Sequence, residues 1–258
     1  MTDPSQSFRK PATAQKDTLS HIFLALVVVF VAAGVALAMG RGGVFGVFVF
    51  VLVGWVISLC LHEWAHAFVA WRGGDHSVVE RGYLTLNPLH YANPLFSIVL
   101  PLAFLALGGI GFPGGAVWVN KAALRKKWWG SAVSAAGPAM NVLCLLLLIV
   151  AARFAGIDTM LGDAIAYLAF LQATAFLLNM LPIPGLDGFG VIETLFDEKS
   201  RDAMRPFENA VSWMFLIAMF MAPALLAPVW NAAEFVCNHL GLPSDPIAAG
   251  LELFRFWS

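Results

Sequence analysis

An apolar run of membrane-spanning length, interrupted by three ionisable side chains, constrains this chain more than any other feature. The run extends from about Val44 to Trp71 and contains the pentapeptide His62-Glu63-Trp64-Ala65-His66. At a rise of about 1.5 Å per residue, His62 lies roughly 27 Å beyond Val44, near the far face of a hydrocarbon core about 30 Å thick. Ionisable groups at this depth are costly unless they are paired or ligated, so the run predicts a functional polar site.

The spacing within the pentapeptide favours a metal site. His62 and His66 are four positions apart, so they share one face of a helix and can present two imidazole nitrogens to one cation. Glu63 then points beside the metal, where it can take a proton from metal-bound water, as in HExxH hydrolases. Ligation by nitrogen and oxygen without cysteine favours zinc. The alternative, a helix that carries the pattern by chance, is disfavoured by the apolar surroundings.

The composition excludes a water-soluble globule. Hydrophobic residues make up 60% of the 258 residues and charged residues 12%, which leaves too little polar surface. We therefore predict an all-α polytopic membrane protein in a lipid bilayer. Cys60, Cys144 and Cys237 are widely spaced in apolar surroundings and are interpreted as small buried hydrophobes, since neither disulfides nor ligands fit this pattern. A net charge of -1 gives no support to a nucleic-acid partner.

About five transmembrane helices are expected, together with a re-entrant or hairpin segment and a short β element near the site. The predicted spans are 22–39, 44–71, 129–152, 164–181 and 210–227. Residues 1–19 have the composition of a disordered cytoplasmic tail, and 20–240 form the membrane-embedded domain. Residues 197–208 are interpreted as a charged connector. The C-terminal tail, 241–258, could lie on the membrane surface.

A hydrolytic zinc needs three protein ligands and a water, so a third ligand must come from elsewhere in the chain. Asp187 is the best candidate, because Pro182 and Pro184 end the preceding helix and leave an extended segment that can reach sideways. Gly185 and Gly188 allow close backbone approach. The alternative is an aspartate in a polar loop beyond a helix end. The other histidines considered lie in a polar connector or near the far end of the chain, where we expect them to be solvated: His76, His90 and His239.

Two separated motifs resemble the paired signatures of the site-2 protease family, the intramembrane zinc metalloproteases. They are HEWAH at 62–66 and NMLPIPGLDG at 179–188; AAGPAMN at 135–141 and TLNP at 85–88 resemble further family stretches, and together these cover much of 55–190. The resemblance implies His62, His66 and Asp187 as Zn2+ ligands, Glu63 as the catalytic acid/base, and Asn179 as a residue that helps to position substrate. It also implies hydrolysis of peptide bonds in or near transmembrane segments of membrane-protein substrates.

If HEWAH and Asp187 share one ion, an odd number of crossings must separate their spans. Two apolar candidates lie between them, so one is not a net crossing. The segment 94–112 contains Pro101 and three glycines and is followed by Pro113, so we assign it as re-entrant or as a hairpin.

This assignment gives an uneven distribution of positive charge. Twelve cationic residues fall on one face of the membrane: Arg9, Lys10, Lys16, Arg72, Arg81, Lys121, Arg125, Lys126, Lys127, Lys199, Arg201 and Arg205. Arg41, Arg153 and Arg255 fall on the other. The positive-inside rule then predicts an active site toward the cytoplasm, in what we expect to be a bacterial inner membrane.

Several alternatives remain at this point. Residues 116–120 (AVWVN) could offer a strand edge to an unwound substrate, or they are only a connector. The prenyl-protein type of membrane HExxH protease would need a downstream glutamate ligand, for which Glu193 is the nearest substitute. A non-proteolytic metal transporter would spread acidic residues and histidines over several spans, whereas a scaffold that carries a metal site would have lost Glu63.

Overall fold

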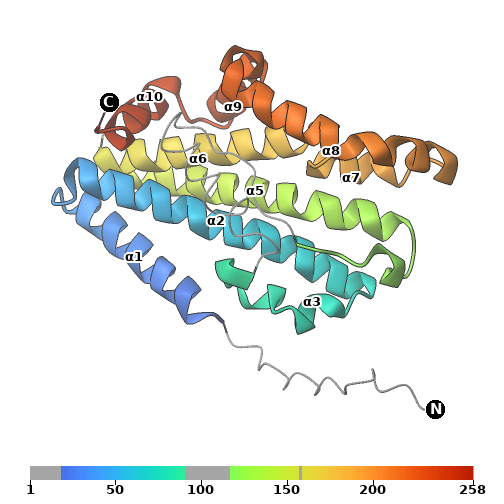
Figure 1. Cartoon of the computed structure of the whole chain (residues 1–258). Helices are drawn as coiled ribbons and strands as arrows, with labels where there is room; N and C mark the ends of the chain where they lie inside the picture. The colour runs from blue at the N-terminus through green and yellow to red at the C-terminus, as the bar shows by residue number, and fades with distance from the viewer. Residues whose placement is uncertain (1–18, 91–116, 157–158, 258) are drawn as a thin grey trace.

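The chain folds as a helical membrane protein. The computed structural model describes residues 19–90, 117–156 and 159–257, which form a bundle of helices with no β-strand among them (Figure 1). Within these described ranges, four helices are long and apolar enough to cross a membrane: α1 (His21–Ala38), α2 (Gly43–Gly73), α5 (Trp128–Ala155) and α6 (Met160–Asn179). The bent pair α8 (Glu198–Met221) and α9 (Ala227–His239) gives a fifth if it is counted as one span. The predicted fold class is therefore confirmed.

Shorter elements connect and cover these spans. They are α3 (Ser77–Glu80), α7 (Asp187–Glu193), α10 (Ser244–Phe254) and the 3-10 turns η1 (Tyr83–Thr85), η2 (Pro88–His90), η4 (Lys121–Ala123) and η5 (Pro223–Leu226). The predicted re-entrant segment, 94–112, lies outside the described residues. On either side of it, Tyr83 and Val119 belong to one apolar cluster with Ala67 of α2. The predicted β element, at 116–120, forms no strand over the part that is described, 117–120.

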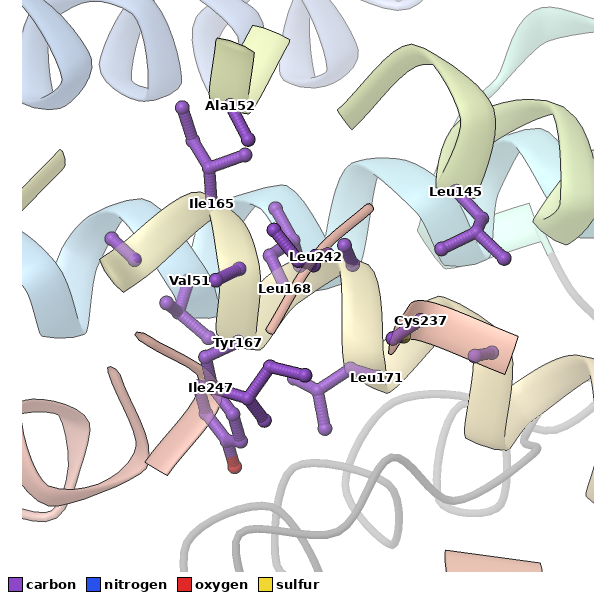
Figure 2. Close-up of a cluster of buried hydrophobic side chains, with 14 of the residues drawn as sticks. Val51, Leu145, Ala152, Ile165, Tyr167, Leu168, Leu171, Cys237, Leu242 and Ile247 are labelled. Carbon is purple, nitrogen blue, oxygen red and sulfur yellow. The ribbon is translucent and has the colours of Figure 1, made fainter. Parts of the chain in front are cut away.

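Helix α6 is the centre of the bundle. Tyr167, Leu168 and Leu171 on this helix are almost fully buried, and they belong to one apolar cluster with Val51 of α2 and Leu145 of α5 (Figure 2). Helix α1 lies at the edge and contacts α2 (Figure 1). Helices α6, α2 and α5 are therefore more buried than α1.

The end of α2, the beginning of α5 and the end of α6 lie at the same end of the bundle. Helix α5 begins beside the end of α2, where the Arg125 N–H donates to the Gly73 carbonyl at 2.9 Å. Helix α6 begins close to the end of α5 in the chain and returns antiparallel to it, so it ends at the same end of the bundle as α2 (Figure 1). The segment after α6 therefore emerges beside the C-terminal half of α2.

Two regions differ from the simplest interpretation of the sequence. Residues 198–208, expected as a charged connector, form the first turns of α8, because the Asp197 side chain caps the helix by accepting from the Ser200 N–H at 2.9 Å and because Glu, Lys and Arg are good helix formers on an exposed face. In the C-terminal tail, α10 packs on α6, with Phe254 buried against Tyr167. A membrane-surface position for the tail stays a prediction.

Candidate metal centre

Helix α2 places two imidazoles side by side. His62 and His66 are both buried, and their Nε2 atoms lie 3.1 Å apart. Their separation of four residues makes this proximity a property of the helix alone. The two nitrogens therefore form one half of a possible ligand set.

The carboxylate of Asp187 completes the group. Its Oδ2 lies 3.2 Å from His62 Nε2, and its Oδ1 lies 3.3 Å from His66 Nε2. Asp187 is the first residue of α7, which follows a non-helical turn after α6. A β-carbon at Gly188 would lie 2.3 Å from the Met180 carbonyl oxygen, so glycine is needed for α7 to pack this closely against the end of α6.

Polar contacts with α5 hold α7 in place. The Ser131 hydroxyl donates to the Val191 carbonyl at 2.6 Å and also contacts the Thr194 hydroxyl. Lys121, just before α5, forms an ion pair with Glu193. The C-terminal part of α7 is thus held against α5, mainly by the partly buried contacts of Ser131.

Hydrogen bonds at the far side of each ring determine which nitrogen faces the centre. His62 Nδ1 lies 2.6 Å from Asn141 Oδ1, and His66 Nδ1 lies 2.7 Å from the Val133 carbonyl. Both partners are oxygens that only accept, so each Nδ1 must carry a hydrogen and donate it. Each Nε2 is thereby left with a lone pair for a metal, the arrangement that outer hydrogen bonds impose on metal-binding histidines.

The donor set fits a zinc ion. Two donors bound to one tetrahedral zinc at about 2.0 to 2.1 Å lie about 3.3 Å from each other. The two Nε2 atoms are 3.1 Å apart, and each of them lies 3.2 or 3.3 Å from a different oxygen of the Asp187 carboxylate. In addition, Asp187 Oδ2 is buried and has no hydrogen-bond partner among the described residues. A cation shared by the three side chains would satisfy this oxygen and both nitrogen lone pairs.

The surroundings of Asp187 keep its carboxylate ionised, which is the form that binds a cation. Burial raises the pKa of the Asp187 carboxyl, but its interactions with the two imidazoles together outweigh burial, so this pKa lies below its usual range. Asp187 is therefore ionised at neutral pH.

Glu63 lies next to the group without belonging to it. Its side chain is buried, and the Val117 N–H donates a hydrogen bond to its carboxylate. Glu63 lies outside the group of possible ligands, which consists of His62, His66 and Asp187. A buried carboxylate beside a cation site is suited to proton transfer.

The structure brings three of the sequence-predicted residues together. His62, His66 and Asp187 form a possible metal group, and no other is found in the part of the chain that the structure describes. Asn179 is buried at the last position of α6, and its substrate-positioning role stays a prediction. Two residues to which the sequence analysis assigned no role, Asn141 and Val133, orient the imidazoles through their oxygens. Asn141 could have been noticed as an amide within an apolar helix.

Curated proteins that resemble this chain carry protease names. It is 45% identical over 251 residues to "Putative zinc metalloprotease Rip2" of Mycolicibacterium smegmatis, an alignment that covers 93% of this chain and 94% of the relative. It is 42% identical over 261 residues to the protein of the same name from Mycobacterium tuberculosis, covering 95% and 98%. "Putative zinc metalloprotease YwhC" of Bacillus subtilis is 32% identical over 192 residues, covering 69% and 84%. No family model and no solved structure matches the chain.

Proposed function

Because this chain belongs to the site-2 protease family of membrane zinc metalloproteases, we propose that it hydrolyses peptide bonds in or near the transmembrane segments of membrane-protein substrates. The observation that carries the proposal is the convergence of His62, His66 and Asp187, with Glu63 beside them, at one end of the spanning helices. Ionisable groups buried in a membrane bundle are costly and mark functional sites.

The chemistry assigned to each residue follows from its position. His62, His66 and Asp187 would hold zinc, which when bound polarises a carbonyl group and makes water more acidic. Glu63 accepts a proton from the attacking water and later donates it to the leaving amine. The Val117 N–H keeps the Glu63 carboxylate in place for both transfers. Asn179, at the end of α6, helps to position the substrate.

Residues 117–120 are the proposed docking edge for an unwound substrate. The segment is attached to the chain that follows α2, because the Asn120 N–H donates to Asp75 Oδ2 at 2.7 Å and the Arg81 guanidinium carbon lies 4.3 Å from the centroid of the Trp118 ring. Val117 connects the same segment to Glu63. A peptide that adds to this edge in extended form would expose its amides next to the acid/base, which a helical substrate cannot do.

The proposed orientation places the site toward the cytoplasm of a bacterial inner membrane. His66 precedes the end of α2 by about two helical turns, so the group lies near one face. The cationic residues that follow, Lys121, Arg125, Lys126 and Lys127, lie at the same end of the bundle and agree with the positive-inside rule.

Membrane vesicles of opposite orientation test the metal dependence and the orientation together. We expect EDTA, which does not cross membranes, to stop cleavage of a test transmembrane substrate in inside-out vesicles, and added zinc to restore it, because only these vesicles present the cytoplasmic face to the chelator. Cleavage that resists EDTA in both vesicle types and in detergent would contradict a zinc protease. Inhibition confined to right-side-out vesicles would contradict the orientation alone.

A transporter or scaffold explains the site less well. Transport would require ligands distributed along the path of the ion through several spans. Among the described residues, the possible ligands converge at a single point, and Glu63 is present beside it. The names of the relatives also support a protease.

A further inference from the structure

A line of buried hydrogen bonds leads from the metal group into the centre of the bundle. His62 Nδ1 donates to Asn141 Oδ1 at 2.6 Å, Asn141 Nδ2 donates to Gln172 Oε1 at 2.9 Å, and Gln172 Nε2 donates to Ser58 Oγ at 2.8 Å. The Ser58 hydroxyl then donates to the Trp55 carbonyl at 2.8 Å. The line joins α5 and α6 to two turns of α2.

Packing alone does not explain these polar side chains. Gln172 is fully buried, and Asn141 and Ser58 are only 3% and 5% exposed. An amide buried in apolar surroundings is costly unless it is hydrogen-bonded, and an apolar residue of similar shape would avoid the cost. A role for the hydrogen bonds themselves is the simpler explanation.

The Ser58 end of the line fixes the orientation of every group as far as His62. Since the Ser58 hydrogen is donated to a carbonyl, its oxygen accepts from the Gln172 amide. Gln172 therefore turns its carbonyl oxygen toward Asn141, and Asn141 in turn faces His62 with Oδ1. His66 needs no such support, because its partner is the Val133 backbone carbonyl, which can only accept.

We propose that Gln172 is a positioning residue for the metal centre. Acting through Asn141, it holds the hydrogen of His62 on Nδ1 and keeps the lone pair of Nε2 directed at the metal. This inference rests on the proposed zinc site. Without Gln172, the Asn141 amide can rotate and present Nδ2 to the imidazole, which favours the tautomer that carries its hydrogen on Nε2.

Making the same substitution at Gln172 in two backgrounds, the wild type and Asn141→Asp, distinguishes a positioning role from a packing role. We expect Gln172→Met to weaken zinc binding by about 10 to 100-fold, the range found for outer partners of metal ligands. In an Asn141→Asp background, the same change should have almost no effect, because a carboxylate presents an oxygen to His62 in either orientation. The measurement is competition for zinc between the purified full-length protein in detergent and a chelating dye.

Thr174→Val is the matched control. Thr174 is buried on the same helix, but its hydroxyl donates only to the Leu171 carbonyl of α6, so zinc affinity should not change. If Gln172→Met does not fold, Gln172→Leu provides the same comparison. Equal affinity in Gln172→Met and wild type, or an equal loss in both backgrounds, would overturn the inference. Absence of zinc binding by the wild type would instead refute the proposed function.

Discussion

Replacing Glu63 by glutamine is expected to stop cleavage while leaving zinc in place. Glutamine keeps the size of the side chain and an oxygen that can accept from the Val117 N–H, but it cannot take up and return a proton. We expect the cleavage rate of a test transmembrane substrate to fall by about 10² to 10⁴-fold, the range for a lost general acid–base group. Bound zinc should remain at the wild-type level, because Glu63 lies outside the ligand group.

Glu193→Gln provides the control for this experiment. Glu193 lies at the end of α7 and forms an ion pair with Lys121, a partly exposed interaction of small energetic value. Both zinc content and cleavage should stay near wild type. Loss of zinc in Glu193→Gln would favour the prenyl-protein type of ligand set, and full activity in Glu63→Gln would remove the proposed acid/base.

Adding a single methyl group at Gly137 is expected to abolish metal binding. A β-carbon there would lie 2.2 Å from His66 Nε2 and 2.5 Å from His62 Nε2, so it would occupy the space into which both nitrogens point. Neither imidazole can retreat without breaking its Nδ1 hydrogen bond to α5. We expect Gly137→Ala to weaken zinc binding by more than about 100-fold, beyond the loss caused by an outer-partner mutation.

Gly130→Ala is the same change about two turns earlier on α5. Its β-carbon would meet only the Thr194 methyl group, at 3.0 Å, and this contact can relax by a small shift. We expect zinc affinity and cleavage close to wild type. Equal zinc binding by Gly137→Ala and Gly130→Ala would show that the two imidazoles do not face α5 as described.

The parts of the site that depend on local spacing could be predicted from the sequence. The spacing of four positions between His62 and His66 is enough to place both rings on one face of a helix. The spans could be predicted because each is long and apolar. To predict Asp187 as a ligand, the prolines that end α6 and the family resemblance were also needed, because no local rule places a distant aspartate beside a given helix.

The parts that depend on contacts between helices could not be predicted. Asn141 lies opposite His62, and Gln172 opposite Ser58, only because α2, α5 and α6 pack in one particular register. That register is set by the whole apolar core and not by any single span. The charged first turns of α8 are a different case, because they resembled a connector although the Asp197 cap is a local helix start that could have been recognised.

The central claim is that two distant stretches of chain hold one zinc ion, and the zinc content of purified Asp187→Ala tests it most directly. Asp197→Ala is the matched control, because it removes another carboxylate, the cap of α8, away from the ligand group. The account predicts about one zinc per chain in the wild type and in Asp197→Ala, and little or none in Asp187→Ala. Wild-type zinc content in Asp187→Ala would contradict it.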